Sequence, residues 1–100
     1  MPTFTVDRLV QFATALLSAA GLDEDEAALV GRSLVDANLR GHDSHGVMRI
    51  PFYVDQVAKG EIVPGAPLTV MRETSDALVT DGHWGFGQTQ AQRLVRRLVE

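Results

Sequence analysis

The sequence has no cysteine among its 100 residues, and this excludes a disulfide framework and any zinc site built on thiolates. It has no apolar run near the roughly 20 residues that a helix needs to span a bilayer. The N-terminus also lacks the charged-then-apolar pattern of a secretory signal. We therefore expect one small cytoplasmic domain with no membrane partner.

The sequence also lacks an excess of positive charge, because it has 9 Lys and Arg but 13 Asp and Glu, which gives a net charge of −4. General binding to a nucleic-acid backbone needs a basic surface, so we expect no nucleic-acid partner. The basic cluster of Arg93, Arg96 and Arg97 falls on one predicted helix, and we interpret it as a solvated face. With 45% hydrophobic and 22% charged residues, the composition is that of a folded domain rather than a disordered chain.

Helical periodicity is clear in the N-terminal part. Thr5 is placed to cap a first helix that stops at Gly21, and a second helix begins at Asp23 and ends by Gly41. The apolar stripe of the first helix consists of Leu9, Phe12, Ala13, Leu16, Leu17 and Ala20. The apolar side of the second consists of Ala27, Val30, Leu34 and Ala37. This pattern predicts an antiparallel helical hairpin with a very short loop.

The remaining elements are shorter. Residues 50–60 read as a third helix with Pro51 in its first turn. Two strand-like runs, 68–72 and 77–80, flank a turn. A final helix, 88–100, keeps its apolar spacing to the end of the sequence without a stop signal. The predicted fold class is therefore α+β: an N-terminal helical hairpin plus a third helix, a short β-hairpin and a C-terminal helix.

The segment from Arg40 to Arg49 is the most informative part of the chain, because it contains two histidines, a carboxylate, a hydroxyl and two arginines. Surface turns use Gly, Asp and Ser freely, but they have no structural need for His-x-x-His followed by Arg. These residue types are suited to moving a proton and holding an anion.

If Ser44 opens a helical turn, His45 and Arg49 lie four residues apart on one face. Arg49 can then hold a carboxylate through two parallel hydrogen bonds, and His45 can exchange a proton with the oxygen on the neighbouring carbon. Ser44 either relays that proton or caps the helix, and the sequence leaves both roles open, together with the protonation state of His45. We interpret Phe52 and Tyr53, which follow, as packing residues.

His42 and His45 also have the spacing of histidines that share a metal ion. A metal site needs a third ligand, for which Asp43 is the obvious candidate, and the flanking Arg40 and Arg49 would repel a cation. We therefore predict no metal site and interpret His42 as a hydrogen-bonded structural residue.

A second motif, Gly82-x-x-Gly85-x-Gly87, resembles part of a dinucleotide-binding fingerprint. The preceding strand is short, and no clear acidic partner for a ribose follows it. We expect Trp84 and Phe86 to pack this turn onto the domain, and we assign no function to His83.

The residues from Asn38 to Pro51, Asn-Leu-Arg-Gly-His-Asp-Ser-His-Gly-Val-Met-Arg-Ile-Pro, resemble the N-terminal signature of the malate/L-lactate dehydrogenase family, which does not use a Rossmann fold. That family includes ureidoglycolate, sulfolactate and diketogulonate dehydrogenases and cyclic-imine carboxylate reductases. The resemblance continues through Tyr53-Val54, Lys59-Gly60, Pro64, Asp81-Gly82, Gly85 and Gly87-Gln88, and so covers nearly the whole chain.

The resemblance implies an NAD- or NADP-dependent oxidoreductase that transfers hydride between a nicotinamide and a small 2-hydroxy or 2-oxo acid. His45 matches the acid/base residue, Ser44 the residue that assists it, and Arg49 the residue that binds the substrate carboxylate. The resemblance also implies a mixed α/β fold, with a separate nicotinamide-binding domain, and a homodimer as the full-length protein. It assigns no cofactor-binding residue within this chain.

Family members are considerably longer than this chain. The resemblance thus implies that residues 1–100 are an N-terminal substrate and catalytic segment, with the nicotinamide-binding domain and a further acidic catalytic residue beyond residue 100. We expect the 100 residues alone to be inactive. The residues by themselves also permit a non-catalytic helical interaction module or a module that binds small anions, and they select neither a particular 2-hydroxy acid nor one of the two nicotinamide cofactors.

Overall fold

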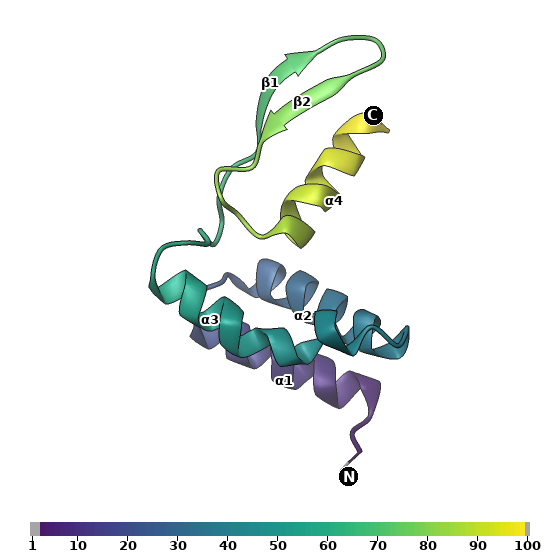
Figure 1. Ribbon diagram of the computed structural model, residues 1–100, viewed down its shortest axis with the longest axis vertical. Coiled ribbons are helices and arrows are strands. Elements are labelled where there is room, and N and C mark those ends of the chain that lie inside the picture. The colour runs from purple at the N-terminus through teal and green to yellow at the C-terminus, as the bar shows by residue number, and fades with distance from the viewer. Residues whose placement is uncertain (1–2, 100) are drawn as a thin grey trace.

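The computed structural model describes residues 3–99. The elements are, in order, α1 (Val6–Ala19), α2 (Glu24–Leu39), two 3₁₀ turns (Asp43–His45 and Val47–Arg49), α3 (Ile50–Ala58), β1 (Thr69–Glu73), β2 (Leu78–Asp81) and α4 (Gly87–Leu98). Helices α1, α2 and α3 lie together as one layer, and the β-hairpin with α4 projects from that layer (Figure 1). The predicted α+β class and the predicted order of elements are confirmed.

Side-chain caps begin both helices of the hairpin, as predicted. The Thr5 hydroxyl accepts a hydrogen bond from the Arg8 amide at 3.2 Å, and an Asp23 carboxylate oxygen accepts one from the Glu26 amide at 2.7 Å. Each cap pairs a backbone N–H that has no partner within its own helix. Gly21 ends α1 with φ of 115°, a left-handed conformation that a residue without Cβ adopts readily.

The hydrophobic core lies where α1 and α2 meet and is closed by a single aromatic side chain from the start of α4. Its buried members are Ala13, Leu17, Leu22, Ala27, Val30, Leu34, Ile50 and Phe86. Phe86 is 1% exposed, and its ring meets the Tyr53 ring edge-on with centroids 5.4 Å apart. This contact ties α4 to α3, and the predicted packing roles of Phe86 and Tyr53 are confirmed.

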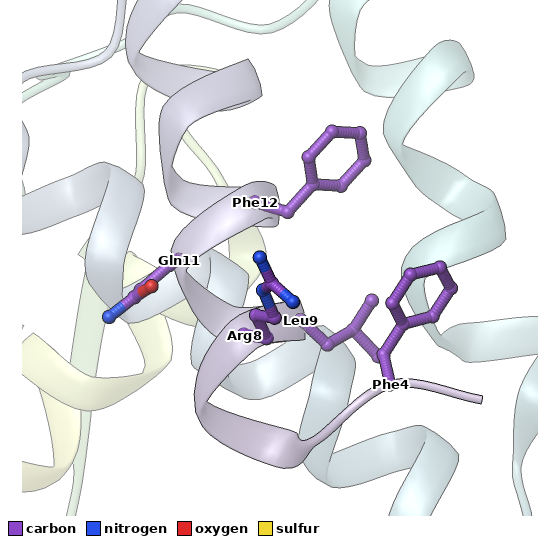
Figure 2. A pocket seen from close by; sticks show the side chains of 5 residues that line it. All are labelled: Phe4, Arg8, Leu9, Gln11 and Phe12. Carbon is purple, nitrogen blue, oxygen red and sulfur yellow. The ribbon is translucent and has the colours of Figure 1, made fainter.

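The predicted stripe of α1 is wrong in part, since Phe12 is 62% and Leu16 38% exposed. Helix α2 covers only the narrow face that carries Ala13 and Leu17. The side chains of Phe4 and Phe12 point to the side opposite that of Gln11 (Figure 2). A surface hollow of about 620 Å³ is lined by Phe4, Arg8, Leu9, Gln11 and Phe12. Helical spacing alone cannot say how wide a face the neighbouring helix will cover.

Strands β1 and β2 form an antiparallel hairpin within one residue of the predicted bounds. Thr69 pairs with Asp81 and Glu73 with Leu78, and the register shifts between Val70 and Arg72. Every residue of β1 is exposed. The hairpin is therefore held mainly by its own pairing and by contacts at its base.

Gln90 makes the contacts at the base. Its amide nitrogen donates to the carbonyls of Ala66, Pro67 and Gly82 at 3.1, 3.1 and 2.8 Å. Arg93 adds a hydrogen bond to the Ala66 carbonyl at 2.7 Å. One face of α4 thus clamps the segments that enter β1 and leave β2.

The arginine cluster is exposed at all three positions, as the interpretation as a solvated face predicted. Two of its members also bind other segments, since Arg93 makes the contact given above and Arg97 forms a 2.8 Å ion pair with Glu73 of β1. The expected packing of Trp84 is wrong, because its side chain is 82% exposed. His83, to which the sequence assigned no function, lies 2.7 Å from the Thr69 hydroxyl through Nε2.

Helix α4 ends at Leu98, and the predicted last residue of this helix, Glu100, lies outside the described residues. Within residues 3–99, none of the helices is long and apolar enough to cross a membrane.

Candidate functional site

The site segment begins where α2 ends. The Gly41 amide donates to the Asn38 carbonyl at 3.0 Å, and the His42 amide donates to the Ala37 carbonyl at 2.8 Å. Gly41 has φ of 83°, so the chain reverses at a residue without Cβ. This reversal directs the residues from His42 to Arg49 back toward the end of α2.

The backbone of the segment is not the helical turn that the sequence suggested. The two 3₁₀ turns are separated by Gly46, which is extended with φ of −95° and ψ of −154°. The prediction that His45 and Arg49 share one face of a continuous helix is therefore wrong. A continuous α-helix starts only at Ile50, with Pro51 in its first turn as predicted.

The three predicted site residues nevertheless come together around one peptide unit. The Ser44 hydroxyl lies 3.1 Å from Nδ1 of His45. Nε of Arg49 donates to the main-chain carbonyl of Ser44 at 2.8 Å. A hydrogen bond from a side chain to a main-chain carbonyl thus achieves the proximity that the sequence analysis assigned to helical spacing.

The reactive groups of this cluster face outward. Ser44 and His45 are exposed, and Arg49 is half-buried. Within residues 3–99, the terminal guanidinium nitrogens of Arg49 make no hydrogen bond, since Nε makes the one contact described. The Arg49 guanidinium carbon also lies 5.9 Å from the centroid of the Phe52 ring, a cation–π distance. Phe52 is 58% exposed, so the packing predicted for this side chain is limited to its contact with Arg49.

His42 and Asp43 have other roles. The His42 amide and carbonyl are both hydrogen-bonded, the carbonyl accepting from the His45 amide at 2.9 Å, so its structural role lies in the backbone. An Asp43 carboxylate oxygen accepts from the Asn38 amide nitrogen at 2.9 Å. Within residues 3–99, no group of three or more His, Cys, Asp or Glu side chains is placed to hold a metal ion.

Asn38 is a contact residue that the sequence analysis did not identify. Besides its bond to Asp43, its carbonyl oxygen accepts from the Val47 amide at 2.9 Å. The available signal was an amide side chain near the end of a helix, just before a glycine turn. That signal is common at helix ends and does not reveal the partners of the side chain.

Two of the glycines in the glycine-rich turn are packed closely against Gln90. A Cβ on Gly85 would lie 2.8 Å from the Gln90 amide nitrogen and 3.0 Å from the Ala66 Cβ, and one on Gly82 would lie 3.3 Å from the Gln90 Cγ. At both positions the missing side chain makes room for Gln90. Gly82 and Gly85 thus serve packing, whereas a Cβ on Gly87 would meet no atom within 4 Å.

Comparison with known proteins assigns the family. Residues 4–100 match the family described as malate/L-lactate dehydrogenase. This chain belongs to that family. It is 35% identical over 94 residues to a malate dehydrogenase from Pyrococcus horikoshii, and 35% identical over 97 residues to hydroxycarboxylate dehydrogenase B from Escherichia coli.

The solved structure of the Pyrococcus horikoshii malate dehydrogenase matches 95% of this chain with a TM-score of 0.90 and 35% identity. The same match covers 27% of that longer chain. This member of the malate/L-lactate dehydrogenase family thus spans about a quarter of the length of its relatives. The family resemblance stated from the signature around His45 is confirmed.

Proposed function

We propose that this chain is the N-terminal substrate-binding and catalytic segment of an NAD- or NADP-dependent dehydrogenase that interconverts a small 2-hydroxy acid and a 2-oxo acid. The observation that carries the proposal is the convergence of the Ser44 hydroxyl, the His45 imidazole and the Arg49 guanidinium on one peptide unit. Family membership supports it, as do relatives named malate dehydrogenase, hydroxycarboxylate dehydrogenase B and, at 41% identity, (2R)-3-sulfolactate dehydrogenase (NADP(+)) from Chromohalobacter salexigens.

His45 would exchange a proton with the substrate oxygen through Nε2. When Nδ1 carries a proton, it can donate to the Ser44 hydroxyl oxygen 3.1 Å away. That hydrogen bond is available both to the imidazolium and to the neutral ring that has given up its Nε2 proton. Ser44 can therefore hold the ring in one orientation through proton delivery and proton uptake.

Arg49 would bind the substrate carboxylate. Its Nε donates to the Ser44 carbonyl, which orients the guanidinium and leaves its terminal nitrogens available to a ligand. A guanidinium edge binds a carboxylate through two parallel hydrogen bonds. Because Arg49 donates to the carbonyl of the residue next to His45, we expect an acid bound to Arg49 to lie near the imidazole.

The nicotinamide, when bound, supplies the hydride acceptor and donor. The residues of this chain contribute proton exchange and anion binding, and Gly82 and Gly85 of the glycine-rich turn are packed against Gln90. We therefore propose that the nicotinamide-binding domain lies beyond residue 100 and that residues 1–100 alone show no turnover. We further propose a cytoplasmic homodimer as the full-length form.

The test uses the product of the full open reading frame and follows nicotinamide absorbance with a panel of 2-oxo acids. His45→Ala should lose nearly all turnover, because general acid–base catalysis contributes about 10²–10⁴-fold. His42→Ala is the matched control, since His42 is an exposed histidine in the same segment, and it should retain activity. An unchanged kcat in His45→Ala would refute the assignment.

A second arm tests Arg49. The wild type should strongly prefer a 2-oxo acid to its methyl ester, because the ester has no carboxylate for the guanidinium to bind. Arg49→Ala should lose kcat/KM for the acid and, with it, the preference for acid over ester. An undiminished preference in that variant would show that another group binds the carboxylate.

A further inference from the structure

The Asn38 side chain joins the two 3₁₀ turns of the site segment. Its amide nitrogen donates to the Asp43 carboxylate in the first turn at 2.9 Å. Its carbonyl oxygen accepts from the Val47 amide in the second turn at 2.9 Å. One rigid amide, fixed to the last turn of α2, therefore holds both ends of the stretch that contains Ser44 and His45.

Gly46 leaves the space that the Asn38 side chain occupies. A Cβ at Gly46 would lie 2.3 Å from the Asn38 carbonyl oxygen and 2.4 Å from its amide carbon and nitrogen. Gly46 is buried, and its φ of −95° is one that any residue can adopt. The glycine is thus needed for space beside Asn38 and not for backbone freedom.

We infer that Asn38 is a positioning residue for the reaction proposed above, acting through the turn that orients His45 and Arg49; this inference rests on the proposed function. His45 lies between the two residues that Asn38 binds, and Arg49 is attached to the Ser44 carbonyl within the same stretch. Movement of the turn relative to α2 would displace both the proton-transfer group and the carboxylate-binding group.

The chemistry of the contact gives a reciprocal test. In Asn38→Asp, one carboxylate oxygen still accepts from the Val47 amide, but the other faces the Asp43 carboxylate and repels it. In Asp43→Asn, the new amide oxygen still accepts from Asn38, so the contact persists. In the double variant, Asn at 43 donates to Asp at 38, and the hydrogen bond is restored in the opposite direction.

The variants are made in the product of the full open reading frame, and kcat and KM are measured for each. Asn38→Asp should lose roughly 10- to 100-fold in kcat/KM, because a small misplacement of a site group is costly. Asp43→Asn and the double variant should both stay near wild type. Asn38→Asp and the double variant share the unfavourable negative charge near the end of α2. Their difference therefore reports the contact with residue 43 together with the charge of that residue, and Asp43→Asn measures the effect of losing that charge while the contact persists.

Urea unfolding and NMR spectra separate positioning from general stability. In Asn38→Asp the urea midpoint should move little, while the resonances of the His45 imidazole and the Arg49 side chain shift. In the double variant, these His45 and Arg49 resonances should return to their wild-type positions. If Asn38→Asp does not fold, recovery of folding and activity in the double variant supports the inference, and no recovery overturns it. Wild-type kcat/KM in a folded Asn38→Asp protein also overturns it.

The two proposals can fail separately. If the wild type turns over no 2-oxo acid, the proposed function fails. The NMR arm then still decides whether Asn38 orients His45 and Arg49, because that arm needs no substrate. Unshifted His45 and Arg49 resonances in Asn38→Asp would overturn the positioning role itself.

Discussion

Replacing Phe86 by Ala should destabilise the chain more than any other single aromatic truncation among residues 3–99. The Phe86 side chain is 1% exposed, and it is the residue through which the start of α4 enters the core formed by α1 and α2. A Phe→Ala change in a core costs about 3–5 kcal/mol, from lost transfer free energy and the remaining cavity. Loss of the edge-on contact with Tyr53, with centroids 5.4 Å apart, belongs to that cost.

The cost of Phe86→Ala is a large part of the free energy of unfolding expected for a chain of this length. A domain of this length has a free energy of unfolding of about 5–15 kcal/mol, so Phe86→Ala should remove a large share of it. With a urea m-value of about 1.5 kcal/mol/M, a loss of about 3 kcal/mol lowers the unfolding midpoint by about 2 M. The measurement is urea unfolding of the 100-residue chain followed by circular dichroism.

Phe12→Ala is the matched control, because it removes the same side chain from a position that is 62% exposed. It should change the free energy of unfolding by less than about 1 kcal/mol, as is usual for surface substitutions. Equal losses for the two variants would refute the placement of the core between α1, α2 and the start of α4. A larger loss of unfolding free energy for Phe12→Ala than for Phe86→Ala would indicate that Phe12 is buried, as the sequence predicted for the apolar stripe of α1.

Two further changes test the contacts that hold the hairpin and the site segment. Gln90→Leu should lower the free energy of unfolding by about 1–3 kcal/mol, because it removes three hydrogen bonds and leaves the Pro67 carbonyl without a donor, while Arg93 and the Gly85 amide still donate to the Ala66 and Gly82 carbonyls. Exposed Gln92→Leu should change it little, and equal thermal stability of the two variants would contradict the role of Gln90 at the base of the hairpin. Gly46→Ala should destabilise the chain in the wild-type background and much less in Asn38→Ala, since its Cβ would collide with the Asn38 amide. A double-mutant cycle should give a coupling of about 1–2 kcal/mol, and additivity within about 0.5 kcal/mol would show that the two residues do not share this space.

Much of the candidate site could be predicted from residue types alone. The histidine, hydroxyl and arginine of the segment from His42 to Arg49 have distinctive chemistry, and the structure brings Ser44, His45 and Arg49 together. The reason for their proximity was not predictable in the same way. It depends on the Arg49 contact with a main-chain carbonyl and on the break at Gly46, and neither follows from helical periodicity.

Local interactions explain why the helices and strands could be predicted from the amino-acid pattern. The caps at Thr5 and Asp23, the reversal at Gly21 and the strand patterns on either side of the hairpin turn act within a few residues, so their effects can be read along the chain. The family signature around His45 is likewise contiguous in sequence. Residues 4–100 match the malate/L-lactate dehydrogenase family as that signature implied.

The packing of the elements against one another sets which faces are buried and which distant groups come into contact. Phe12 and Leu17 both fit the helical stripe of α1, but the position of α2 buries Leu17 and leaves Phe12 exposed. Asn38 reaches Val47 across nine residues, and Gln90 reaches Ala66 across 24. Such contacts depend on how whole elements are placed relative to one another, because a hydrogen-bond partner is selected by distance in space and not by separation along the chain.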